Sequence, residues 1–113
     1  MGDGVWRLLA MALAALRPKG GLLLVDEIDT GLHYSVMTDM WKLIRAVASR
    51  IGVQVFATTH SQDCIQSLAA ICRQDSIDPG EVCIHRIEPE LGRSVKFSEA
   101  EIVAAAERGV EVR

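Results

Sequence analysis

The sequence predicts a single domain of the α/β class, with a mostly parallel sheet layered against helices and a C-terminal antiparallel hairpin. Two short apolar runs, 22–25 and 53–58, are typical of strands that are covered on both faces, as in parallel sheets. Helical patterns precede, separate and follow these runs, which favours a layered α/β arrangement. The chain has 113 residues, 50% of them hydrophobic, so it is long enough for one domain with a core.

The first predicted element, within residues 2–17, is a helix over 5–16 that is apolar nearly all round and is therefore expected to be buried. Pro18 ends it, because proline disfavours helix in the residue before it, and the two following glycines suit a turn. The longest apolar run is far shorter than the ~20 residues that span a bilayer. We therefore expect no membrane segment.

The middle of the chain alternates strands and helices. After the strand at 22–25, apolar residues recur at three- and four-residue spacing over 34–51, which predicts a helix with Gly52 as its C-terminal stop. The strand at 53–58 follows. Ser61 is suited to cap a third helix after this strand.

The C-terminal segment, 81–113, begins with a period of two. Residues 82–87 and 93–97 flank a glycine-containing turn and predict an antiparallel hairpin. Ser98 and Glu101 have the spacing of a capping box, which predicts a last helix. We expect Gly109 to end that helix.

Charge and cysteine content limit the environment of the protein. With 12 Lys and Arg against 15 Asp and Glu, the net charge of -3 argues against binding nucleic acid through overall charge. Cys64, Cys72 and Cys83 are odd in number and lack CxxC spacing, so we expect neither a disulfide framework nor a zinc site. They are typical of small buried residues in a reducing compartment, and we expect a cytoplasmic protein.

Polar residues follow both predicted strands, at the edge where α/β sheets bind their ligands. Asp26 and Glu27 follow the first strand, and His60 follows the second. One carboxylate of the pair can hold a hydrated Mg²⁺ while the other orients or deprotonates a water molecule. The alternatives are a solvated acidic pair and a histidine bonded to backbone.

A third candidate site lies before the first helix, at Gly2, Asp3 and Gly4. A helix N-terminus presents free N–H groups and partial positive charge to anions. Asp3 is equally suited to be the N-cap of that helix.

Together these elements resemble the C-terminal half of an ABC-type ATPase domain, in the soluble branch of chromosome-maintenance, recombination-repair and phage-defence ATPases often described as AAA ATPases. Leu-Leu-Leu-Val-Asp-Glu at 22–27 resembles the Walker B strand, and Asp-Thr-Gly-Leu-His at 29–33 resembles the D-loop. Ala-Thr-Thr-His-Ser at 57–61 resembles the switch-histidine loop, and Gly-Asp-Gly-Val-Trp-Arg at 2–7 resembles the signature motif. The resemblance implies a partial P-loop NTPase fold in which 2–17 is the signature helix, 21–33 the Walker B and D-loop segment and 53–61 the switch-histidine strand.

The resemblance also implies roles for individual residues and a need for ATP and Mg²⁺. Asp26 would hold Mg²⁺ through water, Glu27 would be the general base, and His60 would contact the γ-phosphate. The residues implied to contact the ATP of a partner subunit are Gly2, Asp3, Gly4 and Val5. Those implied to line the subunit interface are Asp29, Gly31, Leu32 and His33.

The sequence departs from the family pattern in two places. The signature motif usually carries a serine at the position of Gly2 or just upstream, and no GxxxxGK[ST] motif (Walker A) occurs in the 113 residues. In the resembled fold, the strand that feeds this P-loop lies beside the strand that ends at His60. We therefore expect the apolar edge at 53–57 to be completed by a homodimer, by a P-loop-containing N-terminal half, or by the hairpin folding across the gap.

Three functions are compatible with these residues. The first is the C-terminal part of a Mg²⁺-dependent ATPase that is active only when a P-loop half is supplied, so that the isolated chain is expected to be inactive. The second is a non-hydrolytic, truncated ATPase-fold module for interaction or dimerisation. The third is a metal-dependent phosphoesterase that uses Asp26, Glu27, Asp29 and His60 directly. Contact with nucleic acid is implied by the resemblance alone and would need regions outside this chain.

Overall fold

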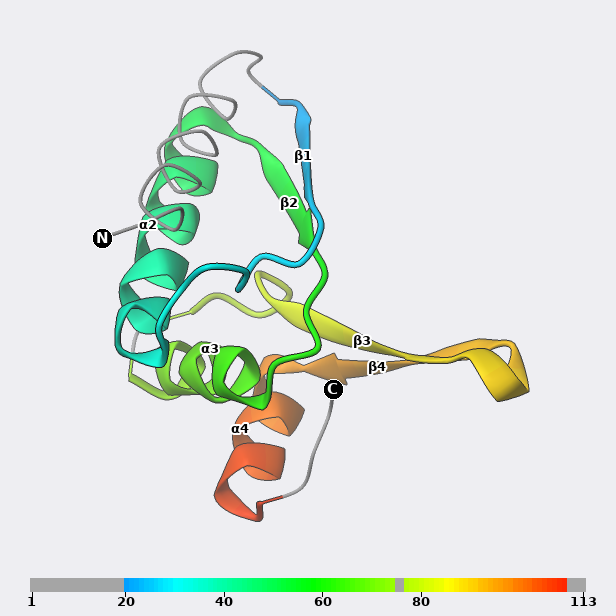
Figure 1. Ribbon diagram of the computed structural model, residues 1–113. Helices are drawn as coiled ribbons and strands as arrows, with labels where there is room; N and C mark the ends of the chain where they lie inside the picture. The colour runs from blue at the N-terminus through cyan, green and yellow to red at the C-terminus, as the bar shows by residue number, and fades with distance from the viewer. Residues whose placement is uncertain (1–19, 75–76, 110–113) are drawn as a thin grey trace.

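The computed structural model describes residues 20–74 and 77–109, which Figure 1 shows in colour. The predicted helix over 5–16 and the signature-like residues Gly2, Asp3, Gly4 and Val5 lie outside the described residues.

A parallel β-α-β unit forms the first part of the described chain. Strands β1 (Leu22–Val25) and β2 (Gln54–Ala57) pair in parallel, with Leu22 opposite Gln54 and Val25 opposite Ala57. Helix α2 (Tyr34–Ile51) connects them, and the left-handed Gly52, with φ of 68°, ends it by donating to the Ala48 carbonyl. The predicted bounds of β1 and α2 are confirmed, whereas β2 is shorter than the predicted 53–58 because Val53 still donates to Ala48 in the helix-ending turn.

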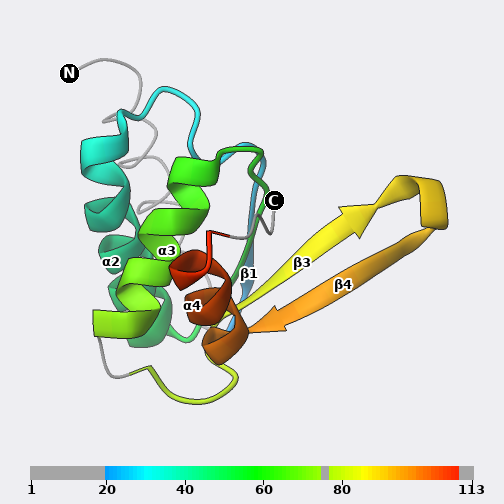
Figure 2. The ribbon, with the colours of Figure 1, turned by 90° about the horizontal axis from the view of Figure 1, so that it is seen from below.

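The second part consists of two helices and a hairpin. Helix α3 (Gln62–Gln74) leads to the antiparallel strands β3 (Cys83–Glu88) and β4 (Arg93–Ser98), which a short 3-10 helix, η1 (Pro89–Leu91), connects. Helix α4 (Glu99–Glu107) follows directly, and the predicted capping box between Ser98 and Glu101 is present. The hairpin projects away from the helices, as Figures 1 and 2 show.

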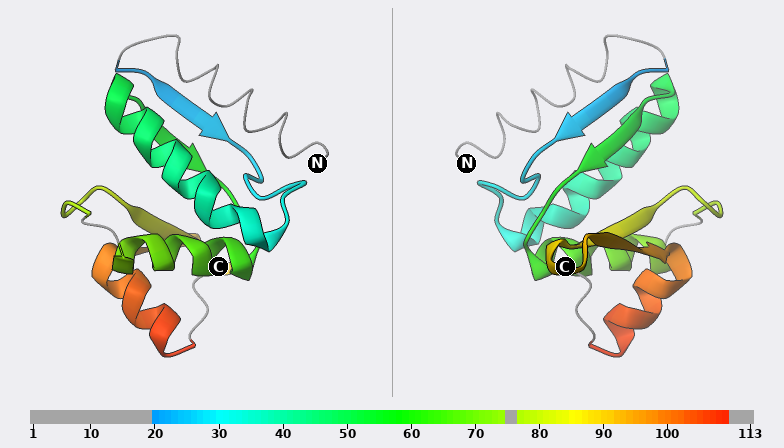
Figure 3. Two further views of the ribbon diagram at one scale, coloured as in Figure 1. Left: turned by 90° about the vertical axis from the view of Figure 1, so that its left-hand side faces the viewer. Right: turned by 90° about the vertical axis from the view of Figure 1, so that its right-hand side faces the viewer.

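Helices α2 and α3 lie on the same side of the β1–β2 pair, as the views in Figure 3 show. The core between these elements contains Val25, Ile28, Met37, Met40 and Cys64. The indole N–H of Trp41 on α2 joins the two helices by donating to the Cys64 carbonyl and to Ser67 Oγ of α3, at 3.1 Å each.

The opposite face of the β1–β2 pair is exposed, which corrects the prediction that both strands are covered on both faces. Leu22 and Leu24 are 65% and 75% exposed, and Phe56, paired with Leu24, is 51% exposed. Side chains alternate across a strand, so these three share one face while Leu23 and Val25 point to the helices. We call Leu22, Leu24 and Phe56 the open sheet face.

The predicted α/β class, with parallel pairing and a C-terminal antiparallel hairpin, is confirmed for the described residues. The strands form two separate two-stranded sheets, β1 with β2 in parallel and β3 with β4 antiparallel. The hairpin therefore does not fold across the edge of β2, and this one of the three expected completions is excluded. The capping box places α4 directly after β4, and the base of the hairpin packs against α4 instead.

The three cysteines occupy different environments. They are free thiols, with Cys64 buried, Cys72 half-buried and Cys83 exposed. The expectation of buried cysteines is wrong for Cys83, because the period of two places it on the outward face of β3 with His85 and Ile87. None of the helices within 20–74 and 77–109 combines the length and the apolar character needed to cross a membrane.

Candidate functional site

The carboxyl ends of β1 and β2 lie side by side and bring the predicted acidic pair and the histidine loop to one edge. The parallel pairing continues beyond the strands, because Thr58 N–H donates to the Val25 carbonyl and Ile28 N–H donates to the Thr58 carbonyl, both at 2.9 Å. Asp26 and Glu27 leave β1 at this point, and both are exposed. His60, two residues after Thr58, is exposed as well.

Glu27 has an unusual backbone conformation. With φ of 49°, it is the one non-glycine residue of the described chain in the left-handed region. This conformation costs a residue with a Cβ roughly 1–2 kcal/mol, and it persists where the surroundings enforce it. Here Glu27 N–H donates to Thr58 Oγ1 at 2.8 Å, and the Glu27 carbonyl accepts from Thr30 N–H at 3.0 Å. The chain therefore turns sharply at the second acid of the pair.

Two consecutive threonines each bind one carboxylate of the turn after β1. Thr58 Oγ1 donates to Asp26 Oδ1, and Thr59 Oγ1 donates to Asp29 Oδ1. Sequence reasoning placed both threonines in the histidine loop but gave them no role. The signal available in the sequence was their position directly after a strand that pairs with the strand before the acids.

Thr59 also shapes the turn that carries His60. Its Oγ1 accepts from Ser61 N–H at 3.0 Å, and Ser61 Oγ accepts from Cys64 N–H at 3.2 Å. Ser61 thus caps α3 as predicted. Asp29, Thr59 and the first turn of α3 form a continuous hydrogen-bonded chain from one strand end to the other.

Ile28 anchors the turn in the core. Its side chain is 0% exposed and belongs to the cluster of Val25, Met37, Met40 and Cys64, although its neighbour Glu27 is exposed. The acidic pair is therefore attached to a buried apolar residue on one side and to β1 on the other.

The remaining D-loop-like residues lead into α2. Gly31 has φ of 81°, which glycine adopts without strain, and Leu32 packs against the core cluster. His33 is the N-cap of α2, and its Nδ1 accepts from Ser35 N–H at 3.3 Å. Its ring lies 4.3 Å from the ring of Tyr34, measured between centroids. In this chain, Leu32 and His33 therefore have clear structural roles.

The donor set at this edge fits a hydrated Mg²⁺ better than a metal held by protein alone. Among the described residues, no three His, Cys, Asp or Glu side chains form a group that could hold a metal ion. Asp26, Glu27, Asp29 and His60 therefore do not converge as the phosphoesterase hypothesis requires. Mg²⁺ in nucleotide sites needs only one or two carboxylates with water and phosphate oxygens, and the exposed Asp26 carboxylate fits that arrangement.

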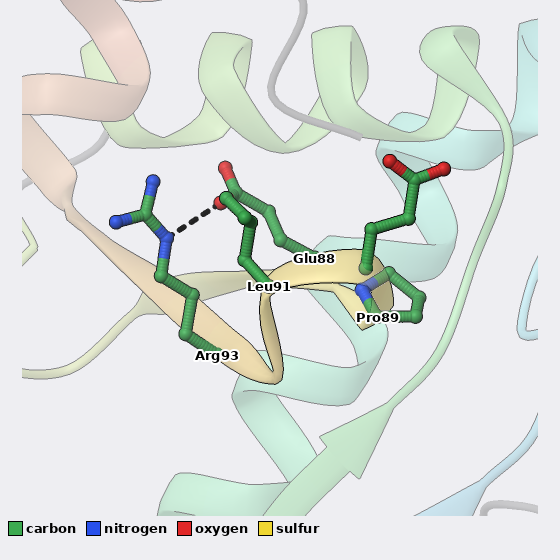
Figure 4. A pocket seen from close by; sticks show the side chains of 5 residues that line it. Glu88, Pro89, Leu91 and Arg93 are labelled. Carbon is green, nitrogen blue, oxygen red and sulfur yellow. Dashed lines mark hydrogen bonds and ion pairs between the residues drawn. The ribbon is translucent and has the colours of Figure 1, made fainter.

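A shallow pocket lies elsewhere, at the tip of the hairpin (Figure 4), lined by Glu88, Pro89, Glu90, Leu91 and Arg93. Glu88 forms ion pairs with Arg93 at 2.7 Å and with Arg86 at 3.0 Å. These hydrogen-bonded guanidinium groups hold the pKa of the Glu88 carboxyl below its usual value, Arg93 most strongly. The pocket lies at the far end of the hairpin from the acidic pair, as Figure 1 shows, and its Glu88 is paired with two arginines, so it is a poor candidate for the chemistry.

Comparison with known proteins shows that the chain carries a fragment of an AAA-type P-loop ATPase. Residues 1–63 match the family model described as "AAA domain, putative AbiEii toxin, Type IV TA system". The match covers more than half of the sequence, and the chain belongs to this family. The resemblance drawn from the motifs is thereby confirmed at the level of the family.

Two relatives extend the comparison. The chain is 33% identical over 76 residues to an "ATP/GTP phosphatase" of Helicobacter pylori, which covers 65% of this chain and 20% of that protein. It is 28% identical over 99 residues to the uncharacterized protein MJECL11 of Methanocaldococcus jannaschii, covering 88% of this chain and 87% of that protein. The chain thus spans about a fifth of the length of the Helicobacter relative. No solved structure gives a significant match.

Proposed function

We propose that this chain is the C-terminal part of a Mg²⁺-dependent ATPase, which hydrolyses ATP when a P-loop half is supplied by another segment or chain. The observation that carries the proposal is the turn at Asp26 and Glu27, which presents two exposed carboxylates beside the His60 loop. Membership of an AAA family and a relative named as an ATP/GTP phosphatase support it.

The proposed roles are those that the family resemblance implies for the residues at this edge. Asp26 holds Mg²⁺ through water, Glu27 takes a proton from the attacking water, and His60 contacts the terminal phosphate. Mg²⁺ supplies positive charge that stabilises the phosphate oxygens during transfer. Successive residues at a strand end point in different directions, so that one acid can bind the ion while the other remains a base.

The two segments that resemble subunit contacts belong to the same proposal. Gly2, Asp3, Gly4 and Val5 would bind the ATP of a second subunit through backbone N–H groups. Asp29, Gly31, Leu32 and His33 would line that contact. A head-to-head dimer is the arrangement in which both segments can act.

The exposed apolar character of the open sheet face favours a further layer of structure on this face, which the P-loop half would supply. Leu22, Leu24 and Phe56 form an exposed apolar surface on strands that carry no third strand in the described residues. Such surfaces in a folded protein are typical of sites covered by another segment or chain. The alternative occupant is a second copy of this chain.

Hydrolysis is tested in a chimera in which this chain replaces its aligned segment in the Helicobacter phosphatase. We expect Mg²⁺-dependent phosphate release that Glu27→Gln lowers by about 100-fold or more, since a general base contributes on this scale. Nucleotide binding should survive this substitution. Asp39→Asn, the same type of change at an exposed position of α2, is the matched control and should retain the activity. Binding without hydrolysis in the unsubstituted chimera would instead favour the non-hydrolytic module.

The docking surface is tested by sedimentation of the full chain alone and with the remainder of the Helicobacter relative, outside the aligned segment. We expect Leu24→Ser to weaken association with that remainder, while Leu91→Ser, at an exposed position of the hairpin tip, leaves it unchanged. Self-association of the chain that Leu24→Ser abolishes would identify a second copy as the occupant. Equal effects of the two substitutions would contradict a role for the open sheet face.

A further inference from the structure

We propose that Thr58 is a positioning residue, whose hydroxyl group fixes the orientation of Asp26 and the backbone turn at Glu27 at the same time. The effect of Thr58 on hydrolysis rests on the proposed function, whereas its effect on the turn can be measured in the chain alone.

Thr58 Oγ1 uses its donor and its acceptor capacity on two successive residues. It donates to Asp26 Oδ1 and accepts from Glu27 N–H at 2.8 Å. A hydroxyl has one proton to donate and two lone pairs, so it is able to make both bonds together. The bond to the carboxylate is of the charge-assisted kind, which is stronger than a bond between neutral groups.

Backbone hydrogen bonds of Thr58 set the position of its hydroxyl oxygen. Thr58 N–H donates to the Val25 carbonyl and the Thr58 carbonyl accepts from Ile28 N–H, so Thr58 is bonded to the residues on either side of the acidic pair. Threonine is branched at Cβ, which restricts its first side-chain torsion. The backbone bonds and the branched side chain together leave Oγ1 little freedom relative to Asp26 and Glu27.

The two acids have different proposed tasks, and Thr58 acts on each in a different way. For Asp26 it holds one carboxylate oxygen, which limits the directions available to the other. For Glu27 it binds the amide hydrogen of a residue in the left-handed region, where such support is needed against backbone strain. Removal of the hydroxyl should therefore disturb both acids without removing either.

Thr59 provides an internal comparison one residue away. Its hydroxyl binds Asp29 and the Ser61 amide, two groups outside the acidic pair. The same substitution at Thr58 and at Thr59 should therefore affect different turns. This contrast separates positioning of the acidic pair from a general loss of a threonine at this edge.

The first test measures exchange of the Glu27 amide with water by NMR in the full chain. Thr58→Val should accelerate this exchange about fivefold, the change expected for one lost hydrogen bond. Thr58→Ser, which keeps the hydroxyl, and Thr59→Val should leave it within about twofold of the parent rate. If Thr58→Val does not fold, as judged by its NMR dispersion, Thr58→Ala takes its place. An unchanged Glu27 amide in the folded variant would overturn the proposal.

The second test measures ATP hydrolysis in the chimera described above. Thr58→Val should lower kcat about tenfold or more with the KM for ATP changed less than about twofold, because binding groups remain in place. Thr58→Ser should restore kcat. Failure of serine to restore it, or equal changes of kcat and KM, would overturn the positioning role. If the unsubstituted chimera has no ATPase activity, the proposed function fails. The exchange rate of the Glu27 amide then tests the role of Thr58 by itself.

Discussion

Ile28 offers a direct test of whether the turn that carries the acids is part of the core. The residue lies between the exposed Glu27 and the half-buried Asp29, yet its own side chain is 0% exposed. It packs with Val25, Met37, Met40 and Cys64, which come from β1, α2 and α3. We therefore predict that Ile28→Ala lowers the free energy of unfolding severely although the residue lies in a loop.

The expected magnitude follows from the burial. Ile28→Ala removes three carbons, which at about 0.8 kcal/mol each gives about 2.4 kcal/mol of lost transfer free energy. The cavity left among the surrounding side chains raises the loss to about 3–5 kcal/mol. The same substitution at Ile87, which is 67% exposed on the hairpin, should cost less than about 1 kcal/mol. Ile28→Val removes one carbon and should cost about 1 kcal/mol.

Urea unfolding of the full chain, followed by circular dichroism, measures these differences. Domains of this size have a free energy of unfolding of about 5–15 kcal/mol. Ile28→Ala is therefore expected to leave little of this stability, whereas Ile28→Val should stay folded, so that its free energy of unfolding can be measured. Losses at Ile28 and Ile87 that agree within about 0.5 kcal/mol would refute the reasoning. The turn would then be attached to the fold by its hydrogen bonds alone.

Two further predictions concern titratable groups. Burial raises the pKa of the Cys64 thiol to about 11, so iodoacetamide at pH 8 should label the exposed Cys83 well before Cys64, as peptide mass spectrometry would show. The hydrogen bond from Arg45 lowers the pKa of Glu81 below its ordinary 4.5, so this pair contributes stability above that value, and the contribution is lost as the pH falls through the lowered pKa. Arg45→Ala should therefore reduce the acid sensitivity of unfolding below pH 4.5, as measured by urea titration at several pH values.

The local elements could be predicted closely because their signals lie within a few residues. Helix α2 has the predicted bounds, since its apolar period and Gly52 mark both the buried stripe and the end. The capping box at Ser98 and Glu101 and the period of two in the hairpin are also confirmed. Each of these patterns reports the conformation of the segment that contains it.

The sheet arrangement could not be predicted in this way, because it depends on which distant segments meet. The apolar residues of β1 indicate two faces suited to burial, but only the pairing and the helices decide which face is covered. The hairpin strands likewise pair with each other and not with β2. A strand's own sequence contains little information on its neighbour.

The candidate residues could be chosen by residue type and position, but their supporting contacts could not. Asp26, Glu27 and His60 were candidates because α/β sheets bind ligands at the carboxyl ends of their strands. The hydroxyl bonds of Thr58 and Thr59 could not be predicted, because they join positions 30 to 32 residues apart and depend on the parallel register. The left-handed conformation of Glu27 is equally invisible in the sequence, since glycine is the residue that usually marks it.

The turn at Asp26 and Glu27 is held in place by the described elements and does not depend on contacts at the open sheet face. Its support comes from the helix side, through Ile28, and from β2, through Thr58. A P-loop half that docks on Leu22, Leu24 and Phe56 would therefore meet an acidic pair that is already oriented, and its binding energy would not be spent on building the turn. Electrostatic catalysis depends on groups that are oriented before the reaction. Docking and catalysis should accordingly be separable in this protein, with Leu24→Ser weakening association and Thr58→Val lowering turnover in a complex that still forms.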